Sequence, residues 1–337
     1  MSDTLGTAAV GRGRRGALHV GDAAHAASPT PRPRKHSGRA RLRLEIALLA
    51  GPAIIVFVGL VIFPVALAAY YGFYRWQGYG APTDWAGLGN YKVILTDPAF
   101  QQAIEHNGLI VVLSLVIQGP LALAIALLLN QKIRGRALIR VLIFVPYVIS
   151  EVIVGTGFSL MLQLTGAVND ALHQIGLGFL ATDWLADPNI ALWTLMGILT
   201  WKYIGFAVIL MLAGLQAIPD ELSEAARIDG ASYWQVQRHI VVPLLGPTMR
   251  IWGFLSIIGA LQLFDLVYII WGQYVSSTAG TSTMATYMAL NGRLAGNYGY
   301  GSAVAVVMFL VSLFDALLYQ RFVLRRDMRG AVTQGVS

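Results

Sequence analysis

Six long apolar segments constrain the fold of this chain more than any other feature. A helix needs about 20 predominantly apolar residues to cross about 30 Å of hydrocarbon. The predicted spans are Leu44–Tyr74, Leu109–Leu129, Leu138–Gln163, Ile190–Gln216, Leu244–Trp271 and Ser302–Phe322. Pro52 and Pro64 lie in the first span, where we expect a tilt or a kink. Only 12% of the residues are charged, against about 25% in soluble domains, so we predict an all-α integral membrane protein with six transmembrane helices.

Positive charge is distributed unevenly along the chain. Residues 1–43, the connection between the second and third spans, the loop 217–243 and the C-terminus hold most of the 24 Lys and Arg. Because cytoplasmic loops carry the excess of positive charge, we predict that this loop and both termini are cytoplasmic. The composition of residues 1–43 indicates a disordered basic tail beside the membrane lipid. Residues 44–326 are predicted to form the membrane domain and residues 327–337 a short second tail, and we expect no nucleic-acid partner.

The loop 217–243 has the signals of two short helices joined by a tight bend. Pro219 suits a first helical turn, and the two acidic residues that follow it complement a helix N-terminus. Gly230 suits the left-handed residue that ends a helix. Ser232 can cap a second helix that runs toward Ile240, after which Pro243 restricts continuation. The residues alone leave two interpretations open, an amphipathic helix pair without a partner or a surface that another protein approaches.

The order of residues in this loop carries a resemblance to a known family. The loop contains Glu224-Ala225-Ala226, then Gly230, and finally Ile240 and Pro243. This order resembles the EAA motif of permease subunits in bacterial ATP-binding-cassette (ABC) importers. The continuation Asp229-Gly230-Ala231-Ser232, with Trp234 and Gln235, is similar to the carbohydrate-uptake branch of the MalF/UgpA type. Further matches are Gly87-Leu88-Gly89-Asn90-Tyr91, Gly166 with Asn169, Trp184-Leu185-Ala186-Asp187-Pro188, the stretch from Leu212 to Pro219, and Phe264-Asp265.

The resemblance covers about residues 44–326, and two positions depart from it. Position 237 is Gln where the family usually has Phe, and Trp271-Gly272-Gln273-Tyr274 replaces the family's Gly-Gly-Pro. The resemblance implies a cytoplasmic two-helix loop that docks on an ATPase, and we call residues 217–243 the coupling loop. The residues it implies for this role are Glu224, Ala225, Ala226, Asp229, Gly230, Ile240 and Pro243.

The same resemblance implies an assembly in the bacterial plasma membrane. Its members would be a second homologous permease, a cytoplasmic ATPase dimer that binds ATP and Mg²⁺, and an extracytoplasmic solute-binding protein that delivers sugar. The chain lacks the phosphate-binding G-x-x-x-x-G-K-[ST] motif, and it has no cysteine and no metal-ligand spacing among its His residues. We therefore predict a transporter subunit that is not itself an enzyme, with no ATPase site, cofactor or metal.

Polar residues inside the predicted spans are candidates for a solute path, because ionisable groups at membrane depth usually face a bundle interior or a water-filled path. Amides, carboxylates and aromatic rings are also the groups that bind sugars. The candidate path residues are Phe264, Asp265, Lys202, Gln262, Glu151 and Tyr147, and Gln118 and Gln163 add further amides. A structural interpretation stays open, in which Lys202 pairs with Asp265 or the polar groups join helices.

The sequence leaves two alternative functions open. One is an ATP-independent carrier or channel, which inverted internal repeats would favour, although the two halves of the sequence show no convincing similarity. The other is an ABC permease for a different solute, such as amino acids or phosphate.

Overall fold

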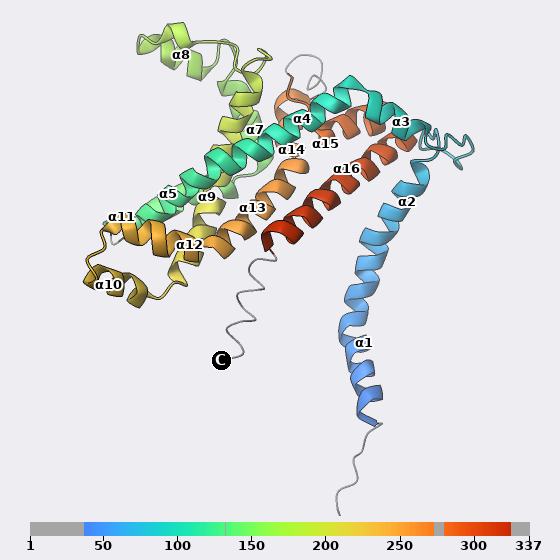
Figure 1. Cartoon of the computed structure of the whole chain (residues 1–337). Coiled ribbons are helices and arrows are strands. Elements are labelled where there is room, and N and C mark those ends of the chain that lie inside the picture. Colours follow the sequence, from blue (N-terminus) through green and yellow to red (C-terminus); the bar gives the residue numbers. More distant parts are fainter. Residues whose placement is uncertain (1–36, 132, 273–279, 325–337) are drawn as a thin grey trace, which may run out of the picture. The chain divides into compact units, whose positions relative to one another are not determined.

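The computed structural model describes residues 37–131, 133–272 and 280–324 (Figure 1). The chain divides into two units, Met1–Phe57 and Val58–Ser337. The described residues of the first unit form α1, Ser37–Phe57, whose side chains from Glu45 onward are mostly exposed apolar groups. Residues 37–43, which the sequence assigns to the N-terminal tail, form the first part of α1. The rest of the two predicted tails lies outside the described residues, and so do Gln273 and Tyr274, where the sequence departs from the family pattern.

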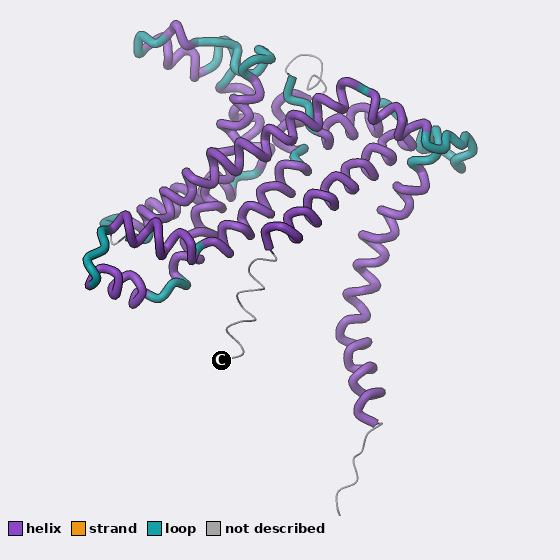
Figure 2. Tube along the Cα trace, in the orientation of Figure 1, coloured by secondary structure: helices purple, strands orange, loops and turns teal. Residues whose placement is uncertain are grey.

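The described part of the second unit is built from helices and loops, without an extended strand (Figure 2). Its α-helices are α2 Phe63–Tyr71, α3 Gly89–Thr96, α4 Pro98–Leu113, α5 Gly119–Leu129, α6 Arg136–Val148, α7 Glu151–Met161, α8 Ala167–Gln174, α9 Ala191–Gln216, α10 Asp220–Ile228, α11 Tyr233–Val236, α12 Val242–Leu244, α13 Gly246–Leu261, α14 Asp265–Trp271, α15 Met284–Met288 and α16 Tyr298–Tyr319. π-Helical turns occupy Val58–Ile62, Ser114–Gln118, Gln237–Val241, Ala289–Leu294 and Gln320–Leu324. The prediction of an all-α protein is confirmed.

Five helical segments of the described chain are long and apolar enough to cross a membrane. They are Glu45–Tyr71, Pro98–Leu129, Ala191–Gln216, Gly246–Trp271 and Tyr298–Val323. A sixth span is formed if α6 and α7, which meet at a bend of 90°, are counted as one. Five of the six predicted spans thus have a matching segment, and the third is matched only by the bent pair α6 and α7 and is not one continuous helix. Ile149 adopts an extended conformation that ends α6, and the Ser150 side chain accepts a hydrogen bond from the Val152 amide to start α7.

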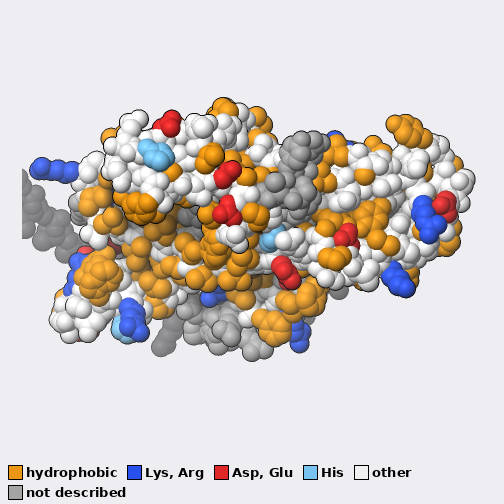
Figure 3. Space-filling view, turned by 90° about the horizontal axis from the view of Figure 1, so that it is seen from above, with side chains coloured by type: hydrophobic (Ala, Val, Ile, Leu, Met, Phe, Trp, Pro, Cys, Tyr) orange, Lys and Arg blue, Asp and Glu red, His pale blue; other side chains and the backbone are white. Residues whose placement is uncertain are grey.

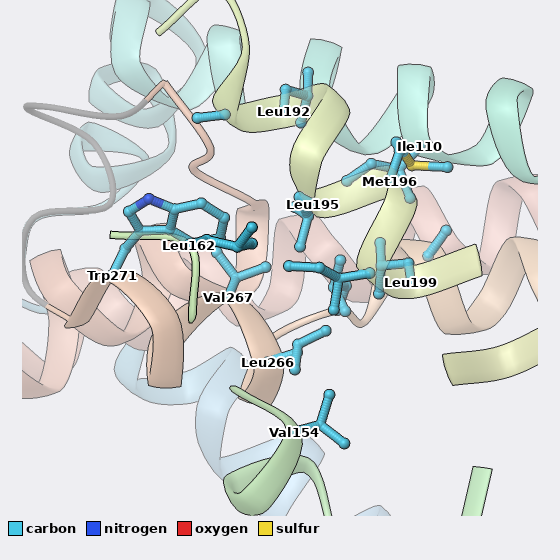
Figure 4. Packing of buried hydrophobic residues seen from close by; sticks show 14 residues of the cluster. Ile110, Val154, Leu162, Leu192, Leu195, Met196, Leu199, Leu266, Val267 and Trp271 are labelled. Atoms are coloured by element: carbon cyan, nitrogen blue, oxygen red, sulfur yellow. The ribbon is translucent and has the colours of Figure 1, made fainter. Parts of the chain in front are cut away.

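A buried apolar cluster joins α9 to the two short helices that follow helix breaks. Leu195 and Leu199 of α9 pack with Leu266 and Val267 of α14, and the labelled side chains converge in Figure 4. Gly155 lets α7 lie directly against α14, because a Cβ atom there would be only 2.6 Å from the Ile269 Cγ2 atom. A second cluster packs α5 and α9 against the segment 236–252. The site described below lies among these helices.

Apolar side chains also cover much of the molecular surface, as the space-filling view shows (Figure 3). Exposed examples on different helices are Val116, Leu142 and Phe314. A water-soluble protein rarely exposes so much contiguous apolar area. This surface is the one expected where lipid or another membrane subunit covers the helices.

A buried segment around α15 ties α4, α13 and α16 together. Asn107 is fully buried; its amide donates to the Ala260 carbonyl at 2.6 Å and accepts from the Met284 amide at 2.8 Å. The Tyr287 hydroxyl donates to the Asp97 carboxylate and lies 2.7 Å from the Tyr300 hydroxyl. Burial, together with these two contacts, raises the pKa of Tyr287, so this phenol stays protonated and keeps its donor role.

Candidate functional site

A cavity of about 330 Å³ lies between α4, α6, α9 and α13. Its volume falls in the range of small-molecule sites, about 300–1,000 Å³. The aromatic residues that line it are Tyr147, Tyr203, Phe206 and Trp252, and the polar ones besides the two tyrosines are Ser114, Gln118, Thr200 and Ser256. Aliphatic side chains such as Leu199 and Leu263 complete the wall. An apolar cavity with a few convergent polar groups is the usual form of a ligand site.

Three polar side chains form one hydrogen-bonded wall of this cavity. The Ser114 hydroxyl donates to the Gln118 amide oxygen at 2.8 Å and lies 2.6 Å from the Ser256 hydroxyl. Because Ser114 has one proton and gives it to Gln118, Ser256 is the donor to Ser114. Within the described chain the Gln118 amide nitrogen has no hydrogen-bond partner, although Gln118 is buried. Its two N–H groups are therefore available to a ligand.

Aromatic rings form a second wall. Tyr147 of α6 and Phe206 of α9 stack with ring centroids 5.3 Å apart. The ring centroid of Tyr203 lies 6.2 Å from that of Tyr147. The Tyr203 hydroxyl donates to the Glu151 carboxylate at the start of α7. Stacked and tilted rings present apolar faces together with a polar edge. This wall can therefore contact the C–H face and a hydroxyl of the same solute.

Of the six residues predicted to line a path, Tyr147 alone lines this cavity. Glu151 lies behind Tyr203, and Lys202 is buried with only 2% of its surface exposed. The expected pair between Lys202 and Asp265 is not formed, since the Lys202 ammonium donates to the Ile149 carbonyl at 2.8 Å instead.

The other three predicted path residues lie beside the break between α13 and α14. Gln262 and Asp265 are exposed, and Phe264 stacks on Tyr268 with ring centroids 5.2 Å apart. Sequence reasoning missed Ser114, Ser256, Tyr203 and Trp252 as lining residues. The available signal was the pair Ser114 and Gln118, four positions apart in an apolar run, which places both on one helix face.

The coupling loop folds as its sequence predicts through its first helix and bend. Pro219 precedes α10, and Gly230 follows it with a φ angle of +86°. Residues other than glycine rarely adopt this backbone conformation. Ser232 then starts α11 with a capping box, in which the Ser232 amide donates to the Gln235 side chain at 2.7 Å. The prediction of two short helices with a bend at Gly230 is confirmed.

The predicted effect of Pro243 is wrong. Helical structure continues from α11 through the π-helical turn Gln237–Val241 into α12, where Pro243 occupies the first turn. A proline has no amide hydrogen to donate, and a π-helical turn is a place where the regular hydrogen-bond pattern of the helix is already interrupted. The π-helical turn, a common site of helix distortion, lies directly before it, so the second helix leads almost directly into α13.

The coupling loop is attached to the spans on one side and exposed on the other. Val236 is fully buried among α5 and α9, and the Gln131 amide donates to the Tyr233 hydroxyl at 2.9 Å. Figure 1 shows α10 and α11 together at one end of the second unit. Ile228 and Trp234 are 87% and 75% exposed. Large apolar side chains at this exposure suit a surface that another protein covers.

The implied coupling residues fall into two groups. Glu224, Ala225, Asp229, Gly230 and Pro243 are exposed, while Ala226 and Ile240 are half-buried against the rest of the unit. Asp229, Gly230 and Ile240 also line an open groove of about 370 Å³ in the bend, together with Ala231, Gln235, Val236 and His239.

Comparison with known proteins decides the family. The profile of the binding-protein-dependent transport system inner membrane component matches residues 118–327. This chain belongs to that family. The trehalose/maltose transport system permease protein MalF of Thermococcus litoralis is 30% identical over 272 residues, which cover 81% of this chain and 91% of that protein. The sulfoquinovosyl glycerol transport system permease protein SmoG of Agrobacterium fabrum is 32% identical over 287 residues, covering 85% and 92%.

The fold is shared with a solved importer. A crystal structure of a bacterial ABC transporter involved in the import of the acidic polysaccharide alginate matches with a TM-score of 0.73 and 24% identity, over 86% of this chain and 97% of that one. The family predicted from the coupling loop is thereby confirmed, and the chain is a multi-pass membrane permease subunit of a binding-protein-dependent transport system.

Proposed function

We propose that this chain is one permease subunit of an ABC importer for mono- or oligosaccharides, and that the cavity between α4, α6, α9 and α13 is its part of the solute path. The coupling loop carries the proposal, because its two short helices are formed in the chain by itself and large apolar side chains are exposed on one of its faces. The cargo follows from relatives whose names specify trehalose and maltose, sulfoquinovosyl glycerol, and lactose.

The cavity has the chemistry that a sugar requires. Tyr147, Phe206 and Trp252 offer ring faces for the C–H surfaces of a pyranose. The Gln118 amide and the Ser256 hydroxyl offer hydrogen-bonding groups for its hydroxyls. The carboxylate of Glu151 acts through the Tyr203 hydroxyl, which it holds at the cavity wall.

The energy for transport comes from a separate ATPase in this proposal. Glu224, Ala225, Ala226, Asp229 and Gly230 form the surface on which the ATPase docks, and the ATPase binds ATP and Mg²⁺. The exposed α10 and the groove at its end support this role. Ile240 and Pro243 position the second coupling helix against α13.

The remaining members of the assembly are a second homologous permease, which completes the path, and an extracytoplasmic binding protein, which delivers the sugar. The basic connections support an orientation in which the coupling loop and both termini are in the cytoplasm of a bacterial cell. This orientation is the one in which a cytoplasmic ATPase can reach α10.

A charge reversal on α10 tests the coupling role. We expect Glu224→Lys, in the complex purified with its cognate subunits, to lose most of the copurifying ATPase and most of the uptake of radiolabelled maltose, trehalose or lactose. Glu105→Lys is the matched control, since Glu105 is an exposed residue of α4 away from the loop. Normal ATPase binding and uptake in Glu224→Lys would rule out this coupling surface. Uptake by the wild-type chain purified without an ATPase would support the ATP-independent carrier instead.

A further inference from the structure

The break between α6 and α7 leaves a backbone carbonyl that its own helix does not satisfy. The two helices meet at 90°, and Ile149 between them has φ and ψ angles of −67° and 136°. The next carbonyl along the chain, that of Ser150, accepts from the Val154 amide and so belongs to α7. An unsatisfied carbonyl inside a membrane is unfavourable because no water is available to pair with it.

Lys202 satisfies this carbonyl from the facing helix. Its Nζ atom lies 2.8 Å from the Ile149 oxygen, and the side chain is 2% exposed in the middle of α9. A cation at this place also complements the negative end of the α6 dipole. The Lys202 ammonium lies 5.5 Å from the centroid of the Tyr203 ring, a cation–π distance.

Two consecutive residues of α9 therefore hold the two sides of the break. Lys202 binds the carbonyl of Ile149, and Tyr203 binds the carboxylate of Glu151, two residues further on. Tyr147, two residues before Ile149, lines the cavity together with Tyr203. The contacts of Lys202 and Tyr203 at the break thus lie within two residues of Tyr147 on one side and include Tyr203 itself on the other.

The interruption between α13 and α14, within the span Gly246–Trp271, shows that a buried charge is not required for this purpose. Near the break between α13 and α14, the carbonyls of Ala260 and Leu263 accept from the Asn107 amide at 2.6 Å and the Thr283 hydroxyl at 2.7 Å. Both donors are neutral and fully buried. Neutral donors satisfy the carbonyls at one break and a lysine the carbonyl at the other, and the lysine lies at the break beside which Tyr147 and Tyr203 line the cavity.

We propose that Lys202 is a positioning residue, which fixes the break between α6 and α7 and thereby the spacing of Tyr147 and Tyr203 at the cavity. Lys202 does not line the cavity, so it acts through these residues and not by touching the solute. Its removal changes the affinity for solute more than the maximal rate or the binding of the ATPase. The affinity effect rests on the proposed solute path, whereas the effect on the break does not.

A distance measurement tests the break without reference to any solute. The chain has no cysteine, so Leu138→Cys on α6 and Val152→Cys on α7, both at exposed positions, can carry spin labels in the purified complex. We expect a narrow distance distribution in the otherwise wild-type chain, a distribution at least twofold broader or shifted in Lys202→Met, and recovery in Lys202→Arg, which keeps the charge and the donors. Met211→Leu is the control, since Met211 is a buried α9 residue of the other cluster.

Uptake kinetics test the consequence for transport. With whichever of radiolabelled maltose, trehalose and lactose the wild type takes up, Lys202→Met should raise KM by about tenfold or more, with less than a twofold change in maximal rate and in copurified ATPase. Tyr203→Phe removes the second contact, the hydroxyl that donates to the half-buried Glu151 carboxylate, and it should also broaden the distance distribution, even if Lys202→Met fails to assemble.

The two measurements separate the two proposals. An unchanged distribution in Lys202→Met, or in Tyr203→Phe if Lys202→Met does not assemble, would overturn the positioning role. A broadened distribution with an unchanged KM would leave that role at the break intact and remove the cavity from the solute path. A wild-type complex that takes up none of the three sugars would count against the proposed cargo alone.

Discussion

The coupling loop takes its shape from residues that are neighbours in the sequence, whereas the cavity takes its shape from helices far apart in the chain. In the loop, the Ser232 amide and the Gln235 side chain are 3 positions apart. In the cavity, Ser114 and Ser256 meet across 142 positions. One face of the loop is exposed, whereas the cavity is lined by side chains from several helices, some of which hydrogen-bond to one another.

This difference predicts two separable kinds of defect. A substitution in the loop should act through the backbone or the docking surface and reduce coupling at unchanged affinity for solute. A substitution in the cavity should change affinity and leave ATPase binding intact. The substitutions below test that separation, beginning with the one that should have the largest effect.

Gly230→Val should nearly abolish uptake. Gly230 has a φ angle of +86° and open space where a Cβ atom would lie, so the effect of valine is one of backbone conformation and not of a clash. Such strain costs about 1–3 kcal/mol, and relief of it would rotate α10 away from its docking position. We expect uptake and copurified ATPase to fall by roughly 10- to 100-fold, as 1.4 kcal/mol corresponds to about tenfold.

Gly176→Val provides the matched control for this substitution. Gly176 follows α8, has a φ angle of +79°, and likewise has open space around its Cβ position. The same strain is thereby introduced outside the coupling loop. Loss of copurified ATPase in both variants would show that the defect is one of general stability and would contradict the local role of the bend.

Tyr147→Ala should be the strongest of the simple cavity substitutions. It removes the ring that stacks on Phe206 and leaves a gap in the aromatic wall. An aromatic contact is worth about 0.5–1.5 kcal/mol beyond its buried area, so KM for uptake should rise by up to about tenfold. Copurified ATPase should be unchanged, and a parallel loss of ATPase would break the proposed separation between cavity and loop.

The local character of the loop explains why the sequence predicted it well. Gly230, Ser232 and Pro219 have conformational preferences that are set within a few residues, and the structure follows them up to Ile240. Pro243 was misjudged because a π-helical turn before it depends on how the segment packs against α5 and α9. The ends of the spans were displaced for a related reason, since polar residues such as Asn107 continue α4 once α13 and α15 satisfy them.

The cavity could not be predicted in the same way. Periodicity indicates that Ser114 and Gln118 share a helix face, but not which helix they meet. Lys202 illustrates the limit most clearly: its charge suggested a carboxylate partner, whereas the break after α6 supplied a carbonyl that sequence alone did not reveal. A polar residue in a span therefore predicts a buried contact more reliably than it predicts the contact's identity.

Ser232→Ala should have an intermediate effect, and on coupling alone. It removes the cap of α11, which typically costs about 1 kcal/mol, while Val236 continues to hold the helix against the spans. Copurified ATPase should fall by about fivefold, with KM for uptake unchanged. Ser159→Ala is the control, because its hydroxyl donates to the Thr156 carbonyl within α7 and lies outside both regions. A change in KM without a change in copurified ATPase would contradict the prediction that Ser232 acts on coupling alone.

Ser256→Ala should have the smallest effect and should fall on affinity. The substitution removes the donor to Ser114 at 2.6 Å, but Ser114 can still donate to Gln118. A neutral hydrogen bond contributes about 0.5–1.5 kcal/mol, and because the network is only partly lost, KM should rise by about two- to fivefold. ATPase binding should stay at the wild-type level, since Ser256 lies in α13 and outside the coupling loop. A rise in KM larger than that of Tyr147→Ala would show that the polar wall, and not the aromatic one, provides most of the affinity.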